Sequence, residues 1–452
     1  MKSINPATNV PIREYSEHTD EEVDQILGTA AEAQRTHAQS TFQERSKHLY
    51  RVAEILLDRR DEYATLMSRE MGKVIAQARA EVEKCAWVCR YFAEHAEAFL
   101  ADETMVSDAS DSFVTFEPLG VVLAVMPWNY PFWQVLRFAA PAVMAGNGAV
   151  LKHASNVSGA ALALESLFRD AGFHHDLFRT LLIPGSRVQH VIADRRVAAV
   201  TLTGSGPAGR SVASAAGRAL KPCVMELGGS DPFIVLDDCN LPSCVETSVL
   251  ARMQNTGQSC IAAKRFIVVE SVLEQFSRLH VDRVEALRVG DPMDTETEIG
   301  PLARRDLVDE LHDQVERSVA AGARVLTGGH RIDGAGAFYA PTVLADVAPG
   351  MVAFEEETFG PVSAIIPAGS EEEAVELANQ SVFGLGASLW TLDLLRAKRL
   401  MRRIQAGAVF VNGMTKSDPR LPFGGIKESG HGRELSIYGI REFVNKKTVW
   451  IA

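Results

Sequence analysis

One cysteine lies in a turn whose residue types suit a nucleophile. Residues 254–260 read QNTGQSC, so Cys260 ends a polar, glycine-containing turn just before an apolar stretch, residues 265–269, that is typical of a β-strand. A cysteine thiolate attacks carbonyl carbons well if its proton is removed and if donors meet the developing oxyanion. We therefore interpret Cys260 as a candidate nucleophile; the ordinary alternative is a buried structural cysteine.

Further motifs accompany this cysteine along the chain. They are PWNYPF at 127–132, ELGG at 226–229, ETFGP at 357–361 and PFGG at 422–425. The residues of these motifs and their order along the chain resemble those of the aldehyde dehydrogenase superfamily. The resemblance extends over nearly the whole chain. The segments KHASN at 152–156 and SDPR at 417–420 look like the bacterial succinate-semialdehyde dehydrogenase group.

The resemblance implies three catalytic roles. Cys260 would attack an aldehyde to give a thiohemiacetal, which loses a hydride to nicotinamide and becomes a thioester. Asn129 matches the residue that donates to the oxyanion together with the backbone N–H of Cys260. Glu226 matches the base that activates water to hydrolyse the thioester, which separates this chain from the coenzyme A-acylating branch. Taken singly, Asn129 could be a turn former and Glu226 an ion-paired loop residue.

A cofactor site is implied in the same way. Residues 204–209, GSGPAG, fit a G-x-G-x-x-G pattern that is weak alone, but they also follow the looser G-S-x-x-x-G turn of the resembling family. The positions that match its cofactor contacts are Trp128, Lys152, Ser155, Gly204, Ser205, Gly209, Leu227, Glu357 and Phe359.

Ser155 bears on the choice between NADP and NAD. Many NAD-preferring relatives carry an acid three residues after the lysine, where it accepts hydrogen bonds from the adenosine 2′-hydroxyl. A carboxylate there would repel a 2′-phosphate, whereas serine would not. We therefore expect NADP to be tolerated or preferred, with NAD as the alternative.

Substrate contacts are expected near Arg137, which matches an arginine that holds the substrate carboxylate in succinate-semialdehyde dehydrogenases. A helix-surface ion pair is the alternative reading. A second arginine of the animal enzymes, six residues before the nucleophile, is replaced by Gln254. Ser417 or Arg420, in the loop before Phe423, is the candidate for the missing contact.

The function expected from these residues is NAD(P)-dependent oxidation of succinate semialdehyde to succinate. The alternatives are a dehydrogenase for another short aldehyde, such as glutarate semialdehyde or a neutral aliphatic one, and a non-catalytic family member. A cysteine hydrolase of another family is a third reading, but no histidine lies near Cys260 or Glu226 in sequence.

Composition narrows the classes of partner. The chain has 452 residues, 46% hydrophobic and 23% charged, so it can bury more than one core. A net charge of −12 argues against nucleic acid or an anionic membrane as partner. With no apolar leader and no long apolar run, we expect a cytoplasmic protein.

No metal site is expected. The six cysteines lack repeated ligand spacing, and Cys85 and Cys89, four residues apart, are better read as helix packing. The pair His174 and His175 is better read as a solvated loop. We also expect the charged residues of 70–73, EMGK, to form a solvated turn.

The elements that position these residues predict an α/β fold. Buried strands at 120–126, 149–151 and 198–202 each lead through a turn into a helix, which is typical of a doubly wound parallel sheet. The family resemblance implies a Rossmann-type dinucleotide-binding domain at 1–101 and 119–228, an α/β catalytic domain at 229–428 and a β oligomerisation arm at 102–118 and 429–452. It further implies a homodimer or homotetramer in which residues 438–450 pair with the arm of a neighbouring subunit.

Overall fold

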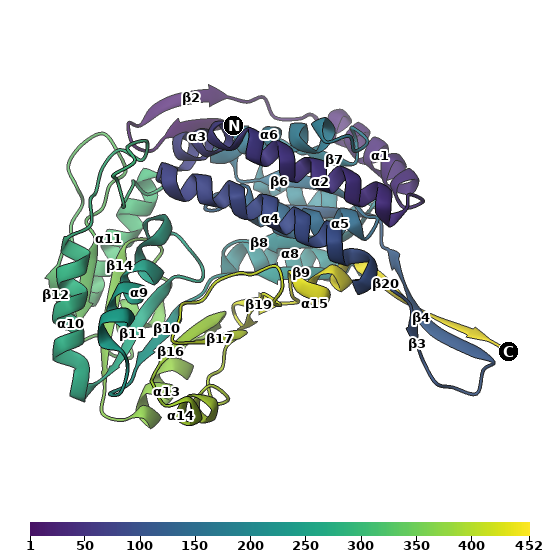
Figure 1. Ribbon diagram of the computed structural model, residues 1–452. Coiled ribbons are helices and arrows are strands. Elements are labelled where there is room, and N and C mark those ends of the chain that lie inside the picture. The colour runs from purple at the N-terminus through teal and green to yellow at the C-terminus, as the bar shows by residue number, and fades with distance from the viewer.

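A six-stranded sheet organises the first half of the computed structural model, which describes residues 1–452 (Figure 1). Its strands follow the order β19-β9-β8-β5-β6-β7, and all are parallel except β19. The strands are β5 (Val121–Met126), β6 (Gly148–His153), β7 (Phe178–Thr180), β8 (Val197–Thr203), β9 (Cys223–Glu226) and β19 (Gly430–His431). The parallel sheet predicted from the strand-turn-helix pattern is confirmed.

Apolar side chains cover both faces of this sheet, because successive strand residues point to opposite sides. Along β5, Val122 and Ala124 join one core, while Val121 and Leu123 join another. The helices over the first face are α2 (Phe42–Asp58), α3 (Arg60–Met71), α4 (Ile75–Phe99), α5 (Trp133–Met144) and α6 (Ser158–Asp170); those over the second are α1 (Asp20–His37), α7 (Val188–Ala193) and α8 (Gly206–Arg218). Cys85 and Cys89 are buried in α4, as expected from their spacing of four residues.

The strand order reverses between β5 and β8. From β5 the chain proceeds outward to β6 and β7, and it then returns to place β8 and β9 on the other side of β5. The loops that follow β5 and β8 therefore diverge at the carboxyl edge of the sheet and leave a crevice, which is where open α/β sheets bind ligands.

A seven-stranded sheet forms the second half, in the order β12-β13-β14-β11-β10-β16-β17, parallel except for β12. Its strands are β10 (Asp231–Val235), β11 (Ala263–Val269), β12 (Arg324–Thr327), β13 (Thr342–Ala345), β14 (Val362–Ala368), β16 (Gly386–Trp390) and β17 (Ala408–Val411). One face packs on α9 (Leu241–Met253) and α10 (Glu270–Glu285), and the other on α11 (Arg305–Ala320), α12 (Val352–Glu355), α13 (Glu371–Asn379) and α14 (Leu394–Leu400). None of the helices in the structure has the length and apolarity needed to cross a membrane.

Short elements complete the chain. They are the hairpin of β1 (Lys2–Asn5) and β2 (Val10–Glu14), the pair of β15 (Phe383–Gly384) and β18 (Ile426–Lys427), helix α15 (Ser436–Ile440) and the 3₁₀ turns η1 (Ser155–Val157), η2 (Gly185–Arg187), η3 (Gln254–Gly257) and η4 (Arg441–Phe443). The pairing of β19 with β9 places residues 430–431 in the six-stranded sheet. The domain boundaries stay a prediction.

A three-stranded arm projects from the body and carries the C-terminus at its tip (Figure 1). It consists of β3 (Glu103–Thr104), β4 (Asp111–Pro118) and β20 (Val444–Ile451). Strand β20 pairs with β4 of the same chain, from Val444 opposite Pro118 to Ile451 opposite Asp111. The expected pairing of this tail with a neighbouring subunit is therefore wrong, because β4 already forms a continuous antiparallel ladder with β20 of its own chain.

The charged residues of 70–73 are buried, so the expectation of a solvated turn is also wrong. The Glu70 carboxylate accepts hydrogen bonds from Ser3 Oγ at 2.6 Å and from the backbone N–H groups of Gly159 and Ala160, both at 2.9 Å. Lys73 forms a buried ion pair with Glu81. The carboxylate of Glu70 thus satisfies amides in the first turn of α6, a tertiary contact that local composition does not reveal.

Candidate active site

The two sheets meet end to end, and this places two predicted residues, Glu226 and Cys260, at one junction. Strand β9 ends at Glu226, and the next strand of the chain, β10, begins at Asp231. Asp231 pairs in register with Ala263, three residues after Cys260. The carboxyl edge of the first sheet therefore faces the amino edge of the second, where Cys260 lies.

The turn before Cys260 has an unusual backbone. Asn255, Thr256 and Gly257 have consecutive φ values of +53°, +56° and +72°. A Cβ on Gly257 would lie 2.2 Å from the carbonyl oxygen of Gly360, so only glycine fits there. Non-glycine residues in the left-handed region cost about 1–3 kcal/mol each and are concentrated at functional sites.

Buried side chains hold this turn in place. Lys264 Nζ donates to the carbonyl oxygens of Ser259 and Cys260, both at 2.9 Å, and pairs with Glu357 Oε1 at 3.3 Å. Asn255 Nδ2 donates to the carbonyl oxygens of Asn129 at 2.8 Å and Gln258 at 3.0 Å. The backbone beside Cys260 is thereby fixed to both halves of the junction.

The Cys260 thiol is desolvated. Burial raises its pKa to about 12, although the positive charges of Arg137 and Lys264 act in the opposite direction. Cys260 is consequently a thiol at neutral pH in this state, and the thiolate requires a proton acceptor or added positive charge in the site.

Asn129 lies beside the cysteine turn. Its Nδ2 donates to the carbonyl oxygen of Gln258 at 3.0 Å, and its Oδ1 accepts from Gln134 Nε2 at 3.0 Å. An amide nitrogen carries two N–H groups, so the second one remains for an oxyanion. The turn that follows Asn129 is held by His153, whose Nε2 contacts the carbonyl oxygen of Pro131 at 2.9 Å. Burial lowers the pKa of His153 to about 4, so the ring is neutral.

Glu226 belongs to a buried charged cluster. Both of its carboxyl oxygens lack hydrogen-bond partners, and burial together with the nearby charge of Glu434 raises its pKa well above the ordinary value. Glu434 forms a buried ion pair with Arg137. An unpartnered carboxyl group of raised pKa is chemically suited to exchange protons with a water or a thiol near neutral pH.

A cavity of about 280 Å³ opens onto Cys260. Its walls combine apolar, amide and charged side chains, and three of these are cationic while one, Glu81, is acidic. The lining residues are Gln77, Ala80, Glu81, Lys84, Tyr130, Trp133, Gln134, Arg137, Leu250, Gln254, Ser259, Cys260, Ile261, Met414, Thr415, Lys416, Ser417 and Phe423.

The predicted substrate residues differ in their surroundings. Arg137, Ser417 and Phe423 line the cavity, and the Arg137 guanidinium lies 4.6 Å from the centre of the Phe423 ring. Arg420 does not line it: this exposed side chain pairs with Asp418 at 2.7 Å. Sequence reasoning missed Lys84, which lines the cavity from α4, because no motif marks a lone lysine on an amphipathic helix.

The predicted cofactor residues gather at the carboxyl edge of the six-stranded sheet. Lys152 is near the end of β6, and Ser155 begins η1 with an exposed side chain. Gly204 N–H donates to the carbonyl oxygen of Glu226 at 2.9 Å, and Ser205 is the N-cap of α8 but makes no side-chain cap bond. The first amides of α8 are thus left for an anionic ligand.

Two contacts shape this edge further. A Cβ on Gly209 would lie 2.4 Å from Leu227 Cδ2, so the glycine lets α8 approach the loop after β9. The rings of Trp128 and Phe359 meet edge to face at 5.7 Å, and Glu357 Oε1 accepts from Gly229 N–H at 3.1 Å. Glu357 therefore contacts both the loop after β9, through Gly229, and Lys264, which holds the cysteine turn.

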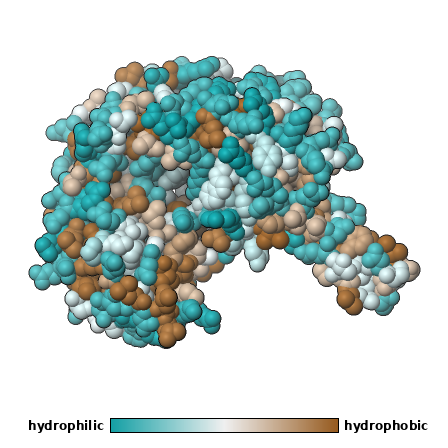
Figure 2. All heavy atoms as spheres, in the orientation of Figure 1, coloured by the Kyte–Doolittle hydropathy of each residue, from teal (hydrophilic) through white to brown (hydrophobic).

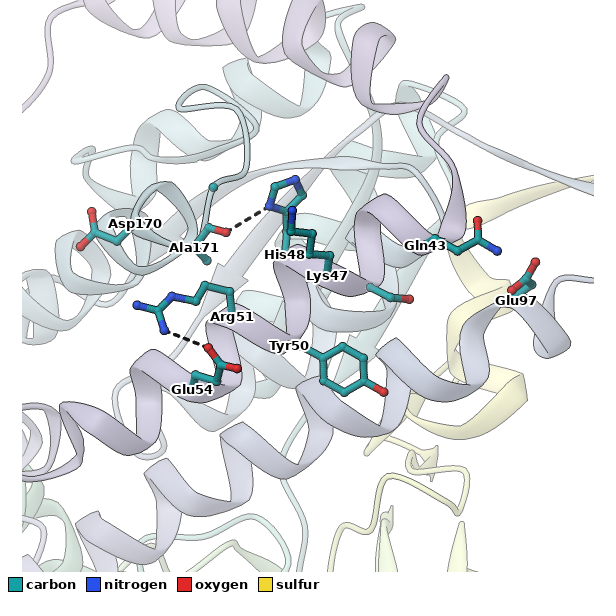
Figure 3. Close-up of a pocket in the computed structure, with 11 residues that line it drawn as sticks. Gln43, Lys47, His48, Tyr50, Arg51, Glu54, Glu97, Asp170 and Ala171 are labelled. Atoms are coloured by element: carbon teal, nitrogen blue, oxygen red, sulfur yellow. Dashed lines mark hydrogen bonds and ion pairs between the residues drawn. The ribbon is translucent and has the colours of Figure 1, made fainter.

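Other candidate sites contain none of the predicted residues. A cavity of about 750 Å³ between α2 and the turn after α6 is lined mainly by exposed side chains, of which Arg51 pairs with Glu54 at 2.8 Å (Figure 3). His174, His175 and Asp176 bring ligand atoms within 4.8 Å of one another, so the pair does have a neighbouring carboxylate. Asp176 already pairs with Arg179.

Comparison with known proteins gives consistent results. Residues 1–449 match the model of the aldehyde dehydrogenase family. The chain is 54% identical, over the full length of both proteins, to a probable succinate-semialdehyde dehydrogenase [NADP(+)] of Synechocystis sp.. It is 50% identical, again over the full length of both, to succinate-semialdehyde dehydrogenase [NADP(+)] 1 of Mycobacterium tuberculosis.

Solved structures agree. The succinic semialdehyde dehydrogenase of Streptococcus pyogenes, determined in complex with NADP+, superposes with a TM-score of 0.98 at 38% identity, covering 100% of this chain and 99% of the other. The family and fold inferred from the sequence are confirmed. Because the family model matches residues 1–449, nearly the full length, this chain belongs to the aldehyde dehydrogenase family.

Proposed function

We propose that this protein oxidises succinate semialdehyde to succinate with NADP+ as the hydride acceptor. The observation that carries the proposal is the cavity that ends at Cys260, whose lining has three cations against one acid. Such a wall favours a substrate with a carboxylate at the end opposite its aldehyde. Relatives at 50–54% identity over the full chain carry the same activity and cofactor in their names.

The residues at the carboxyl edge of the six-stranded sheet fit NADP+. The α8 amides are not capped by a side chain, and Lys152 is half-buried with a pKa that burial lowers. A hydroxyl rather than a carboxylate stands at Ser155, so no negative charge from this position opposes a 2′-phosphate. Lys152 and Ser155 would hold the ribose and phosphate end. When bound, NADP+ supplies the acceptor for a hydride.

The chain's own residues perform acylation. The Cys260 thiol loses its proton to solvent, and its sulfur forms a bond to the aldehyde carbon, whose oxygen becomes an oxyanion. Asn129 Nδ2 and the backbone N–H of Cys260 donate to that oxyanion. As the hydride leaves the carbon, the C=O bond re-forms and the product on Cys260 is a thioester.

Deacylation needs water and a base. Glu226 accepts a proton from water as the water oxygen attacks the thioester carbon. The C–S bond then breaks, Cys260 departs as thiolate and succinate is released. The raised pKa of Glu226, which follows from burial beside Glu434, brings its proton affinity closer to that required for this exchange.

We further propose a cytoplasmic homodimer or homotetramer. The arm exposes apolar side chains at its tip, among them Val106 at 103%, Trp450 at 53% and Ile451 at 49% relative exposure, in the projecting lobe of Figure 2. Exposed apolar residues on a protruding ribbon favour burial against another subunit.

The test is the rate of NADPH or NADH appearance with succinate semialdehyde and with butanal, each with both cofactors. We expect the highest kcat/KM for succinate semialdehyde with NADP+, and no turnover by Cys260→Ala. Equal kcat/KM for the two aldehydes would refute the substrate assignment, and preference for NAD+ would refute the cofactor assignment.

A further inference from the structure

Two cysteines lie at the start of α9, the end of this helix that is remote from the Cys260 turn. Asn240 is the N-cap of α9, and its side chain accepts a hydrogen bond from the backbone N–H of Ser243. Cys239 is the residue before the cap, and Cys244 is the fourth residue of the helix. Side chains at these two positions commonly pack against each other and fix the angle at which the chain enters a helix. Helix geometry therefore brings the two sulfur atoms together.

The two side chains are in contact. The thiol of Cys244 donates a hydrogen bond to the sulfur of Cys239. Cys244 has a relative exposure of 0% and belongs to the core on the α9 face of the seven-stranded sheet, while half-buried Cys239 packs against the same core. Both are free thiols. One sulfur is thus reachable from solvent, and the other is enclosed beside it.

Cys239 also has the more reactive sulfur, because the reactive form of a cysteine is the thiolate. The hydrogen bond from Cys244 lowers the pKa of Cys239, as does its own backbone N–H, whereas burial and the charges of Asp238 and Asp237 act in the other direction. Burial raises the pKa of each of the other five cysteines, which are Cys85, Cys89, Cys223, Cys244 and Cys260. Cys239 therefore combines access to solvent with a larger thiolate fraction.

We propose that Cys239 and Cys244 form a reversible redox site that hydroperoxides oxidise to a disulfide. The Cys239 thiolate attacks one oxygen of the peroxide, and the O–O bond breaks. The departing alkoxide or hydroxide takes a proton from solvent, and Cys239 becomes a sulfenic acid. The Cys244 sulfur then bonds to the Cys239 sulfur, and the sulfenic oxygen leaves as water with the Cys244 proton. The two sulfurs lose two electrons, and the peroxide gains them.

Cys244 has two roles in this site. It donates the hydrogen bond that favours the Cys239 thiolate, and it lies in place to react with the sulfenic acid. A sulfenic acid without a neighbouring thiol is open to further oxidation to the sulfinic acid, which thiol reductants do not reverse. The pair therefore keeps the oxidation reversible. Cys260 takes no part in it, so the inference does not depend on the proposed dehydrogenase activity.

The first experiment treats the full-length protein with tert-butyl hydroperoxide, alkylates the remaining thiols with iodoacetamide and cleaves the chain after glutamate. The peptide of residues 227–246 contains Cys239 and Cys244 and no other cysteine. In wild type, mass spectrometry should find this peptide lighter by two hydrogen atoms and without alkylation, and dithiothreitol should restore two alkylatable thiols. If the peptide kept both thiols, or if either cysteine were bonded to a cysteine elsewhere, the proposal would be overturned.

Two control variants remove cysteines outside the pair. Cys260→Ala should form the disulfide as wild type does, because the candidate nucleophile is not involved. Cys223→Ala is the matched control, since Cys223 is also half-buried but lies on β9. Loss of the disulfide in either variant would show that its thiol takes part, and this would contradict the assignment to Cys239 and Cys244.

Two further variants separate the attacking sulfur from the one that resolves it. In Cys244→Ala, Cys239 should stop at the sulfenic acid, which dimedone labels, and should pass to the sulfinic acid at higher peroxide concentration. In Cys239→Ala, buried Cys244 should stay an unmodified thiol. If dimedone labelled Cys244 in Cys239→Ala as fast as Cys239 in Cys244→Ala, Cys239 would not be the attacking sulfur, and the proposed order of steps would be wrong.

Discussion

Replacing Arg137 with methionine should destabilise the protein, because it leaves the buried carboxyl group of Glu434 without its ion-pair partner, next to the buried carboxyl group of Glu226. Arg137 and Glu434 are each 3% exposed, so water cannot replace the lost partner. Removing one member of a buried ion pair costs about 3–5 kcal/mol. The burial of both side chains supports a value within that range.

The expected shift in melting temperature follows from chain length. The entropy of unfolding is about 2.1 cal/mol/K per residue, or about 1 kcal/mol/K for a chain of this size. A loss of about 3–5 kcal/mol then lowers Tm by about 3–5 °C if the chain unfolds as one unit. The shift roughly doubles if the half that contains the six-stranded sheet unfolds alone.

The assay is thermal and urea unfolding of Arg137→Met, Glu434→Gln and the double variant. The double variant should be more stable than Arg137→Met, because Glu434→Gln removes the buried carboxylate that Arg137→Met leaves without an ion-pair partner. If Arg137→Met were as stable as wild type, or if the double variant were no more stable than Arg137→Met, the ion pair would not have the structural role assigned to it.

Three other changes test separate parts of the site and fold. Glu226→Gln should give a burst of NADPH and then slow turnover, with steady-state kcat lowered about 10²- to 10⁴-fold. Mass spectrometry should find the acyl group on Cys260. If the burst were lost by the same factor as steady-state kcat, Glu226 would not be the base of deacylation. Ser155→Asp should lower the NADP+ to NAD+ ratio of kcat/KM by about 10- to 100-fold, and an unchanged ratio would place the 2′-phosphate elsewhere. His280 is fully buried with a pKa lowered to about 3, so the unfolded chain binds more protons below pH 6.5 and stability falls as pH decreases from 6.5 toward 3. His280→Gln should reduce that slope by up to about 1.4 kcal/mol per pH unit in urea unfolding, and an equal slope would show that His280 is not its source.

Local patterns in the sequence were enough to predict the sheet and several of its helices. The apolar runs of β5, β6 and β8 each precede a turn and a helix, and burial on both faces of a parallel strand leaves that continuous signal. The motifs around Cys260 likewise predicted the family, because the chemistry of a nucleophile and its turn lies in adjacent residues.

Contacts between distant segments were not predictable in this way. Glu70 and Lys73 look like a polar turn, but Glu70 contacts Ser3 and the start of α6, and Lys73 contacts Glu81. Whether a charged residue is solvated or buried depends on which elements pack over it, and local composition does not contain that information. The pairing of β20 with β4 in one chain has the same origin, since the two strands are more than 300 residues apart.

The sequence by itself therefore determined the family, the sheet and the identity of the candidate nucleophile, since hydrophobic periodicity and the residues of a motif are local properties of the chain. Tertiary structure alone decided how charge is distributed around Cys260. Glu434 lies almost 300 residues from Arg137 and forms a buried ion pair with it, while Glu81, one turn before Lys84 on α4, is paired with Lys73. The electrostatics of a buried site depend on the distances between charges, and only the folded chain sets those distances.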